Sequence, residues 1–158
     1  MKKIVYCSNT GHTEKYAKML GEKLNIEVLS FSDVKSISKD TEIIFMSWVF
    51  GNNVVDLQKA IERFKIISVI AVGMNSNNEK TVNSLKESNK ITLPFYYLQG
   101  GVDYNKLKGI KKIIIKMVGK MVAKENKEED KETIEIFKNG GNFISEDKLD
   151  DIIKDGVI

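Results

Sequence analysis

Short apolar segments alternate with amphipathic stretches through residues 1–98. Most of the apolar segments are followed by a stretch with helical periodicity. The segments that predict strands are residues 4–6, 26–29, 43–46, 66–72 and 95–98. The 66–72 segment has no polar alternate face, which is typical of a central parallel strand covered by helices on both sides. This alternation predicts an α/β fold with a doubly wound parallel sheet and right-handed crossovers.

Two of the intervening stretches show the apolar stripe of an amphipathic helix. The stripe of the first comprises Tyr16, Ala17, Leu20 and Leu24. The stripe of the second comprises Val55, Leu57, Ala60, Ile61 and Phe64. Beyond residue 98 the pattern predicts a long basic helix over about 105–123, a charged connector and a terminal helix near 146–153. Because 158 residues suit one core and no proline-rich linker divides them, we predict a single domain over residues 1–158.

Composition narrows the class of protein further. Hydrophobic residues make up 42% and charged residues 30% of the chain, which is ordinary for a soluble globular protein. The apolar runs are far shorter than the roughly 18 residues that span a bilayer, and no apolar signal segment follows Met1, so we expect a cytoplasmic protein. The only cysteine, Cys7, and the only histidine, His12, are too few for a zinc cluster, so we expect no metal site.

The turn after the first predicted strand has the chemistry of a phosphate site. It comprises Ser8, Asn9, Thr10, Gly11, His12 and Thr13. In open parallel sheets, ligands bind beyond the carboxyl ends of the strands. Here hydroxyl groups, a glycine and the amino end of a helix would meet a phosphate monoester. The glycine spacing and lysine of a nucleoside-triphosphate loop are absent. The alternative is that these Ser and Thr residues only cap the helix.

This loop resembles the first loop of the flavodoxin family, Ser/Thr-x-Thr-Gly-x-Thr, at every specified position. In that family the loop holds the phosphate of FMN. The resemblance implies a flavodoxin-like fold, in which a five-stranded parallel sheet of order 2-1-3-4-5 has helices on both faces. It also implies FMN as the cofactor and electron transfer through it. No catalytic acid, base or nucleophile is then needed, since the flavin supplies the redox chemistry.

A second resemblance follows the third predicted strand, where flavodoxins have a loop with an aromatic residue stacked on the flavin ring. The residues expected to bind there are Trp48, Val49, Phe50, Gly51 and Asn52. Phe50 is the first candidate for stacking and Trp48 the second, and the alternative for both is core packing. The loop after the fourth strand, with Gly73, Met74 and Asn75, is expected from its position to offer backbone donors to the ring edge.

The two reactive side chains near the phosphate loop have ordinary interpretations as well. Cys7 is interpreted as a small buried residue, and the alternative is a thiol whose pKa is lowered near a helix amino terminus. His12 occupies an unrestricted position of the motif, where a solvent-exposed side chain is expected. When protonated, it would assist phosphate binding electrostatically.

The segment 97–104 and the Lys-Met pairs of the basic helix resemble a flavodoxin-domain branch that includes the quinone-linked protoporphyrinogen oxidases. The long insertion and arginine-rich tail expected in those oxidases are not present. These resemblances leave three candidate functions. The first is an FMN-dependent electron carrier or small reductase component, the second is a membrane-associated oxidase of that type, and the third is a flavin-free binding protein.

Charge bears on the partners. The formal net charge is +3, and Asn52 and Asn53 stand where flavodoxins often have acidic residues, so we predict a less negative flavin potential than in acidic flavodoxins. The basic helix is either a core helix with solvated lysines or a docking surface for a membrane or an acidic partner. Its proposed apolar face comprises Leu107, Ile110, Ile114, Met117 and Met121. Without interleaved aromatic residues, nucleic acid is not expected, and the redox partner proteins stay unidentified.

Overall fold

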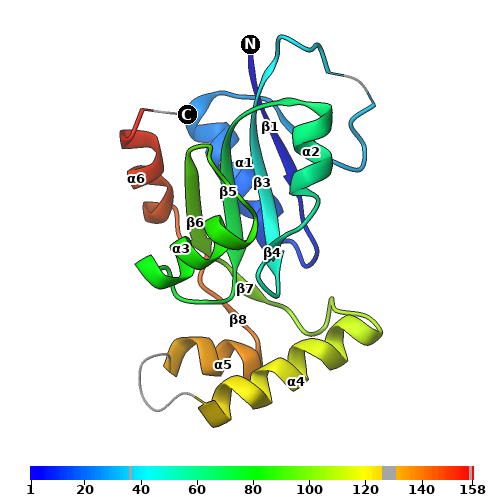
Figure 1. The fold of residues 1–158 in the computed structure, drawn as a ribbon, viewed down its shortest axis with the longest axis vertical. Helices are drawn as coiled ribbons and strands as arrows, with labels where there is room; N and C mark the ends of the chain where they lie inside the picture. The colour runs from blue at the N-terminus through cyan, green and yellow to red at the C-terminus, as the bar shows by residue number, and fades with distance from the viewer. Residues whose placement is uncertain (36, 126–130, 157) are drawn as a thin grey trace.

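The computed structural model describes residues 1–158 except 36, 126–130 and 157. Five parallel strands form the central sheet in the order β2-β1-β3-β5-β6 (Figure 1). They are β1 (Lys2–Cys7), β2 (Val28–Ser30), β3 (Glu42–Phe50), β5 (Lys65–Gly73) and β6 (Phe95–Gln99). Since β5 and β6 are the fourth and fifth predicted strands, this is the predicted order 2-1-3-4-5. A short sixth strand, β4 (Asn53–Val54), pairs antiparallel with the end of β3.

The third strand is longer than its sequence pattern indicated. It continues through Trp48, Val49 and Phe50, where Val49 pairs with Val54 of β4. The residues expected in a loop after this strand therefore belong to the strand itself and to the tight hairpin that follows it. A side chain at the end of a strand has a better defined direction than one in a free loop.

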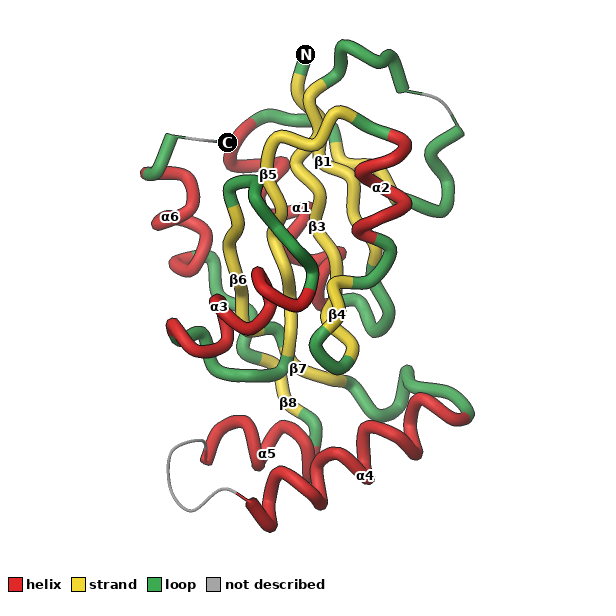
Figure 2. The backbone as a smooth tube through the Cα atoms, viewed as in Figure 1, coloured by secondary structure: helices red, strands yellow, loops and turns green. Residues whose placement is uncertain are grey.

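Helices cover both faces of the sheet, as predicted (Figure 2). The first helix, α1, and the last, α6, pack on one face, where Tyr16 and Leu149 are fully buried. The other face is covered by α2 and α3, which contribute Leu57 and Leu85 to its core. The bounds of these helices are α1 (His12–Leu24), α2 (Leu57–Arg63), α3 (Glu79–Ser88) and α6 (Asp147–Lys154).

The predicted stripe is confirmed for α1 but only partly for α2. Tyr16, Ala17 and Leu20 are fully buried. In the second stripe, Val55 precedes the helix and Ile61 is 44% exposed. The physical reason is that α2 has only about two turns. Its two buried residues are three apart, and they define a narrower stripe than the sequence pattern indicated.

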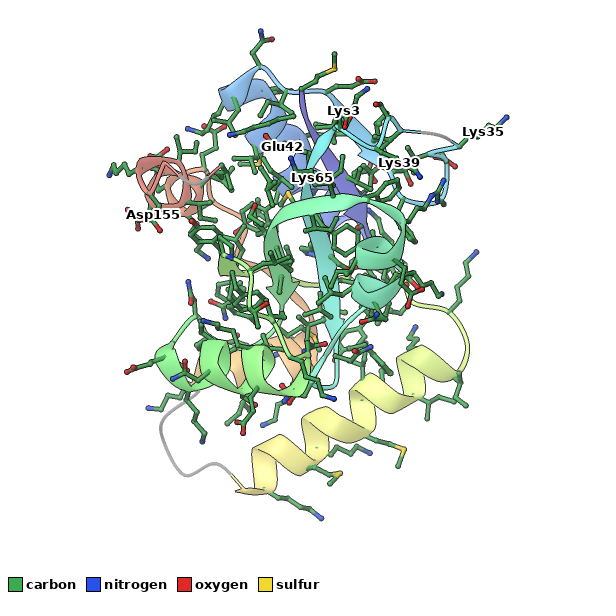
Figure 3. The ribbon with its side chains drawn as sticks, turned by 45° about the horizontal axis from the view of Figure 1, so that its top comes forward. Lys3, Lys35, Lys39, Glu42, Lys65 and Asp155 are labelled. Carbon is green, nitrogen blue, oxygen red and sulfur yellow. The ribbon has the colours of Figure 1, made fainter. Side chains whose placement is uncertain are left out.

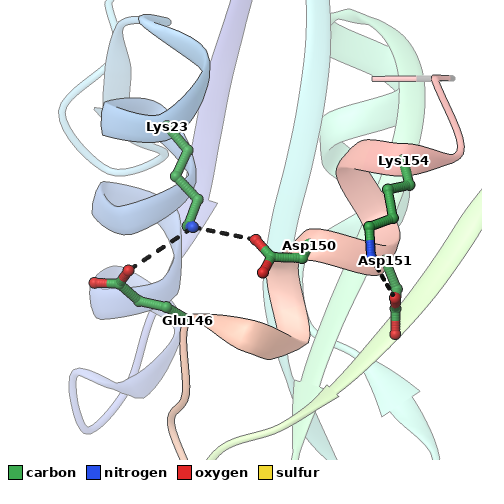
Figure 4. Close-up of polar contacts among 5 residues, drawn as sticks. All are labelled: Lys23, Glu146, Asp150, Asp151 and Lys154. Carbon is green, nitrogen blue, oxygen red and sulfur yellow. Dashed lines mark hydrogen bonds and ion pairs between the residues drawn. The ribbon is translucent and has the colours of Figure 1, made fainter.

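The terminal helix is tied to the first helix by ion pairs. The Nζ of Lys23 on α1 lies 3.1 Å from a carboxylate oxygen of Asp150 and 3.8 Å from one of Glu146 (Figure 4). Two α6 side chains, Leu149 and Ile152, are buried in the core against α1. The terminal helix therefore packs on the sheet, as expected from the sequence.

Beyond the carboxyl end of the sheet lie two further helices, α4 (Ile110–Glu125) and α5 (Lys131–Asn139) (Figures 1 and 2). The strand β7 (Gly101–Val102) leads toward α4, and β8 (Gly141–Asn142) returns from α5 and pairs antiparallel with it. The basic helix thus starts later than expected. The predicted charged connector contains α5 and β8, although its residues 126–130 lie outside the described part of the chain.

Two further features concern the helices and the distribution of charge. Within the described ranges, no helix is both long and apolar enough to cross a bilayer. Charged side chains gather at the amino end of the sheet, where Lys65 pairs with Glu42 at 3.2 Å. Figure 3 shows Lys35 and Lys39 near this end, with α4 at the other end of the molecule. These two lysines are therefore distant from the lysines of α4.

Candidate functional site

A cavity of about 380 Å³ opens at the carboxyl ends of β1, β3 and β5. It brings together nearly all residues that the sequence singled out. The predicted residues that line it are Ser8, Asn9, Thr10, His12, Thr13, Trp48, Val49, Phe50, Gly51, Asn52, Gly73, Met74 and Asn75. Gly11 does not line it and instead borders an adjoining hollow of about 430 Å³. Whether these residues contact a ligand stays a prediction.

The first loop has the geometry of an anion cradle. Gly11 is the amino cap of α1 with a φ of 95°, a left-handed conformation that favours glycine. Its N–H donates to the Ser8 Oγ at 3.2 Å, which holds the loop closed. Gly11 has no side chain with which to cap α1, so the first N–H groups of the helix face the loop without a capping side chain from that position. Because the Ser8 hydroxyl accepts from the N–H of the cap residue, a capping role and a phosphate-binding role are both compatible with this loop.

His12 differs from the expected exposed side chain. It is half-buried, and its Nδ1 lies 3.1 Å from the Thr10 Oγ1. Burial, and then the positive charge of Lys15, hold the pKa of His12 below its ordinary value. The ring is therefore neutral at neutral pH and completes the loop as a hydrogen-bonding partner of Thr10.

Lys106 also lies at the phosphate loop, which sequence reasoning did not foresee. A Cβ added to Gly11 would lie 3.6 Å from the Lys106 Nζ. Lys106 and Lys15 both line the adjoining hollow and both lower the pKa of His12 by their charge, while Asp103 raises it. The cradle is thus flanked by two cations and one acid. The only sequence signal for Lys106 was its place in a lysine-rich segment far along the chain.

The two candidate aromatic residues lie side by side at the end of β3. The ring centroids of Trp48 and Phe50 are 5.7 Å apart with an interplanar angle of 56°. Both side chains are half-buried and both line the cavity. Phe50 also packs with Val102 and Leu107 in a third apolar cluster. Ligand contact and core packing are therefore compatible roles for Phe50.

Helix α3 fixes the tip of the β3–β4 hairpin. The Asn89 side chain accepts a hydrogen bond from the Val54 N–H at 2.9 Å and donates one to the Asn52 carbonyl at 3.0 Å. The Asn52 side chain donates to the Ser84 Oγ at 2.9 Å. These contacts hold the hairpin, and with it the aromatic pair, in one position.

The loop after β5 is held by residues of β6 and the turn after it. The Gly73 carbonyl accepts from the Gly100 N–H at 2.8 Å, the Met74 carbonyl from the Gln99 Nε2 at 3.3 Å, and the Asn75 carbonyl from the Tyr97 hydroxyl at 2.8 Å. The three carbonyls of this loop are thus bonded to protein groups, and the groups predicted to meet a ligand are its backbone N–H groups. That role stays a prediction.

Cys7 does not line this cavity, and its surroundings favour the protonated thiol over the thiolate. Burial, and then the negative charge of Asp56, raise the pKa of Cys7. Its Sγ lies 3.6 Å from the Asp56 Oδ2. The alternative of a lowered pKa is therefore wrong. In the described part of the chain, no three His, Cys, Asp or Glu side chains form a group that could hold a metal ion.

Helix α4 and the segment before it cover the cavity. Leu107 and Ile115 are 4% and 5% exposed and line it together with Val102 and Tyr97. The remaining lining residues that sequence reasoning missed are Val72, Leu85 and Gly101. The apolar face predicted for this helix is therefore wrong as an inner face, because Ile110, Met117 and Met121 are exposed. Leu107 is buried but precedes the helix, and the side chain of Ile114 lies outside the described part of the structure. Ile115 lies on the side of α4 that faces the cavity.

These features suit a phosphorylated ligand with a flat ring. The lining combines hydroxyl-bearing residues of the loop after β1 with aromatic and aliphatic side chains from β3, β6 and the segment that covers the cavity. The volume falls within the range of about 300–1,000 Å³ that is usual for small-ligand sites. FMN has this division of chemistry, so the residues present fit it. Fold and site together define an α/β protein with a candidate ligand site at the carboxyl edge of its sheet.

Comparison with known proteins identifies the family. The sequence model of the flavodoxin domain matches residues 3–130, and the chain belongs to this family. A solved structure described as a flavodoxin from the domain Archaea is similar at 19% identity, with 72% of this chain and 90% of that chain covered and a TM-score of 0.42. No curated protein matches the sequence.

Proposed function

We propose that this protein binds FMN in the cavity and transfers electrons through it. The observation that supports this most is the convergence of a donor-rich loop at β1 and an aromatic pair at β3 on one cavity. FMN supplies the redox chemistry when bound, and the protein binds, orients and shields it.

Each part of the site has a distinct role in this proposal. The hydroxyls of Ser8, Thr10 and Thr13, together with the first N–H groups of α1, bind the phosphate. Phe50, or else Trp48, stacks on the ring system. The loop at residues 73–75 donates from its backbone to the ring edge. No side chain is assigned to proton transfer, since an electron carrier needs none.

Shielding is the role of the covering segment. Leu107 and Ile115 exclude water from the ring end of the cavity, which strengthens the hydrogen bonds inside it. We include a cytoplasmic location in the proposal, with partner proteins there as electron donor and acceptor. The single cysteine and the charged composition agree with that location.

Flavin binding is tested by absorption spectra before and after addition of FMN, together with fluorescence titrations of FMN and of riboflavin. The expected result is tight FMN binding with a shifted spectrum, and much weaker binding of riboflavin, which lacks the phosphate. Thr10→Val should weaken FMN binding by about tenfold, the loss of one charge-assisted hydrogen bond of about 1.5 kcal/mol. Riboflavin affinity should stay unchanged in that variant.

Thr81→Val on α3 is the matched control, because Thr81 is half-buried and lies outside the cavity. Equal affinities for FMN and riboflavin would refute the phosphate assignment. A purified protein that is colourless and takes up no FMN would refute flavin binding and favour a flavin-free binding protein.

A membrane-associated oxidase of the protoporphyrinogen type is the second candidate. The observation that favours it is the apolar outer side of α4, where Ile110 is 71% exposed. The test is quinone-dependent oxidation of protoporphyrinogen by the FMN-loaded protein. Turnover would favour the oxidase, and its absence with intact FMN binding would leave the electron carrier.

A further inference from the structure

The outer side of α4 presents a stripe of large apolar side chains to solvent. Ile110, Ile113, Met117 and Met121 are 71%, 59%, 59% and 58% exposed. Their spacing of three and four residues places them along one side of the helix. Ile115, which lines the cavity, is 5% exposed and lies on the other side. The stripe therefore is not needed to cover the cavity.

A row of lysines runs beside the apolar stripe. Lys112, Lys116, Lys120 and Lys124 repeat at every fourth position of α4. Seven lysines and no acidic residue occur between positions 104 and 124. Within the part of the chain that the structure describes, none of these four lysines forms an ion pair, and the Lys116 Nζ lies 5.8 Å from the Tyr104 ring centroid. The acidic residues expected to neutralise this row fall mainly within 126–130, outside the described residues.

The size and position of α4 limit how it meets a surface. Sixteen residues make a helix of about 24 Å, and this one includes several lysines. Such a helix lies in the plane of a bilayer surface rather than across the bilayer. In Figures 1 and 2, α4 lies at the far end of the molecule, with no element beyond it. Among the described residues, no helix or strand therefore lies between α4 and a flat surface at this end of the molecule.

We propose that α4 docks this protein on an anionic lipid surface, with the apolar stripe in the acyl boundary and the lysines at the headgroups. Charge decides between this occupant and a second copy of the chain. Pairing two copies through the stripe would bring two lysine rows together, which is repulsive, whereas anionic headgroups neutralise them. Long lysine side chains also reach from the helix to the headgroup level while their stems stay apolar.

Docking through α4 would place the candidate site next to the membrane. One side of the helix lines the cavity, and the opposite side would contact lipid. The cavity would then lie one helix away from the lipid surface. This inference does not rest on flavin binding, since the stripe and the lysines belong to the protein alone.

The test is flotation of the full chain with phosphatidylcholine vesicles, with and without phosphatidylglycerol, at low salt. We expect the protein to float with the vesicles that contain phosphatidylglycerol and not with the vesicles of phosphatidylcholine only. Met117→Ser/Met121→Ser should lower the partition coefficient about tenfold or more, through loss of apolar burial. Lys120→Gln/Lys124→Gln should lower it about thirtyfold, at about 1 kcal/mol per lysine.

Matched controls keep the two effects separate. Ile61→Ser removes an exposed apolar side chain from α2, and Lys35→Gln/Lys39→Gln neutralises two lysines distant from α4 (Figure 3). Both should float like the wild type. All of the α4 substitutions fall on exposed side chains, so thermal unfolding should be unchanged and will show that each variant is folded.

Three outcomes would overturn the proposal. Absence of flotation with anionic vesicles at low salt would remove it. Flotation that depends on the lysines but not on Met117 and Met121 would show surface attraction without insertion of the stripe. A concentration-dependent dimer that Met117→Ser/Met121→Ser abolishes, without flotation, would assign the stripe to an interface between copies.

Discussion

Replacing Gly73 by alanine tests how tightly the loop after β5 is packed. Gly73 ends β5 and pairs with Gln99 of β6. A Cβ at this position would lie 2.6 Å from the Tyr97 Oη, closer than real contacts allow, and 3.0 Å from its Cε2, which is an unusually tight contact. Tyr97 is 4% exposed and its hydroxyl is bonded to the Asn75 carbonyl, so its ring can make room only by giving up that hydrogen bond and shifting toward the cavity that it lines.

The expected cost follows from two contributions. Overpacking a buried position costs about 1–3 kcal/mol. Displacing the Tyr97 hydroxyl, which donates to the Asn75 carbonyl at 2.8 Å, costs about 1 kcal/mol more. We therefore expect Gly73→Ala to lower the free energy of unfolding by about 2–4 kcal/mol. The change should also disturb the 73–75 loop that borders the cavity.

Tyr97→Phe provides the matched second variant. It removes the atom closest to the added methyl group, and by itself it costs about 1 kcal/mol because a carbonyl loses its donor. Gly73→Ala should then cost about 1 kcal/mol less in the Tyr97→Phe background than in the wild type. This difference is the coupling energy of a double-mutant cycle.

Urea unfolding of the four proteins, followed by circular dichroism, measures these free energies. Equal m-values would show that the same transition is compared. The reasoning is refuted if Gly73→Ala is as stable as the wild type. It is also refuted if its cost is the same in both backgrounds, since the hydroxyl would then not limit the packing.

Three further predictions concern the neighbourhood of the site. Burial holds the pKa of His12 below its ordinary value of about 6.5, so the free energy of unfolding should be highest above that pH and decline as the pH falls toward the lower pKa of the folded state. His12→Gln should flatten this decline in urea midpoints measured from about pH 7.5 to about pH 5, and an unchanged slope would count against the prediction. Asn89→Ala should cost about 1–3 kcal/mol in thermal unfolding, because two backbone groups of the β3–β4 hairpin lose their partner, and unaltered stability would contradict this. The flavin potential should be less negative than in acidic flavodoxins, and Asn53→Asp should make it more negative in a redox titration; a very negative value in the wild type would rule this out.

The sheet and the position of its ligand site were predictable because they follow from local pattern and general topology. Five apolar segments of strand length, separated by helical stretches, permit few arrangements other than a doubly wound sheet. The carboxyl ends of parallel strands meet at one edge, so the loops at Ser8, Trp48 and Gly73 were expected together. Gly11 was recognisable from its place in the loop motif, and the structure adds that the turn into α1 gives it a left-handed conformation.

The cover of the cavity was beyond sequence reasoning. Helix α4 has apolar residues around much of its circumference, so periodicity could not identify the inner side. Contact with the cavity turns Ile115 inward and leaves Met117 exposed. The helix α5 was missed because its segment follows directly on a run of charged residues and was assigned together with that run to a connector.

The sequence by itself determined the fold class, the strand order and the polar loop at β1, since each depends on neighbours along the chain or on a short motif. Only the tertiary structure decided which distant residues join the site. Tyr97, Lys106 and Ile115 come from segments remote from the loops they meet, and their own surroundings in sequence do not indicate that contact. Contacts between segments that are distant in sequence depend on how the helices, strands and loops pack in three dimensions, and the periodicity of one segment does not specify that packing.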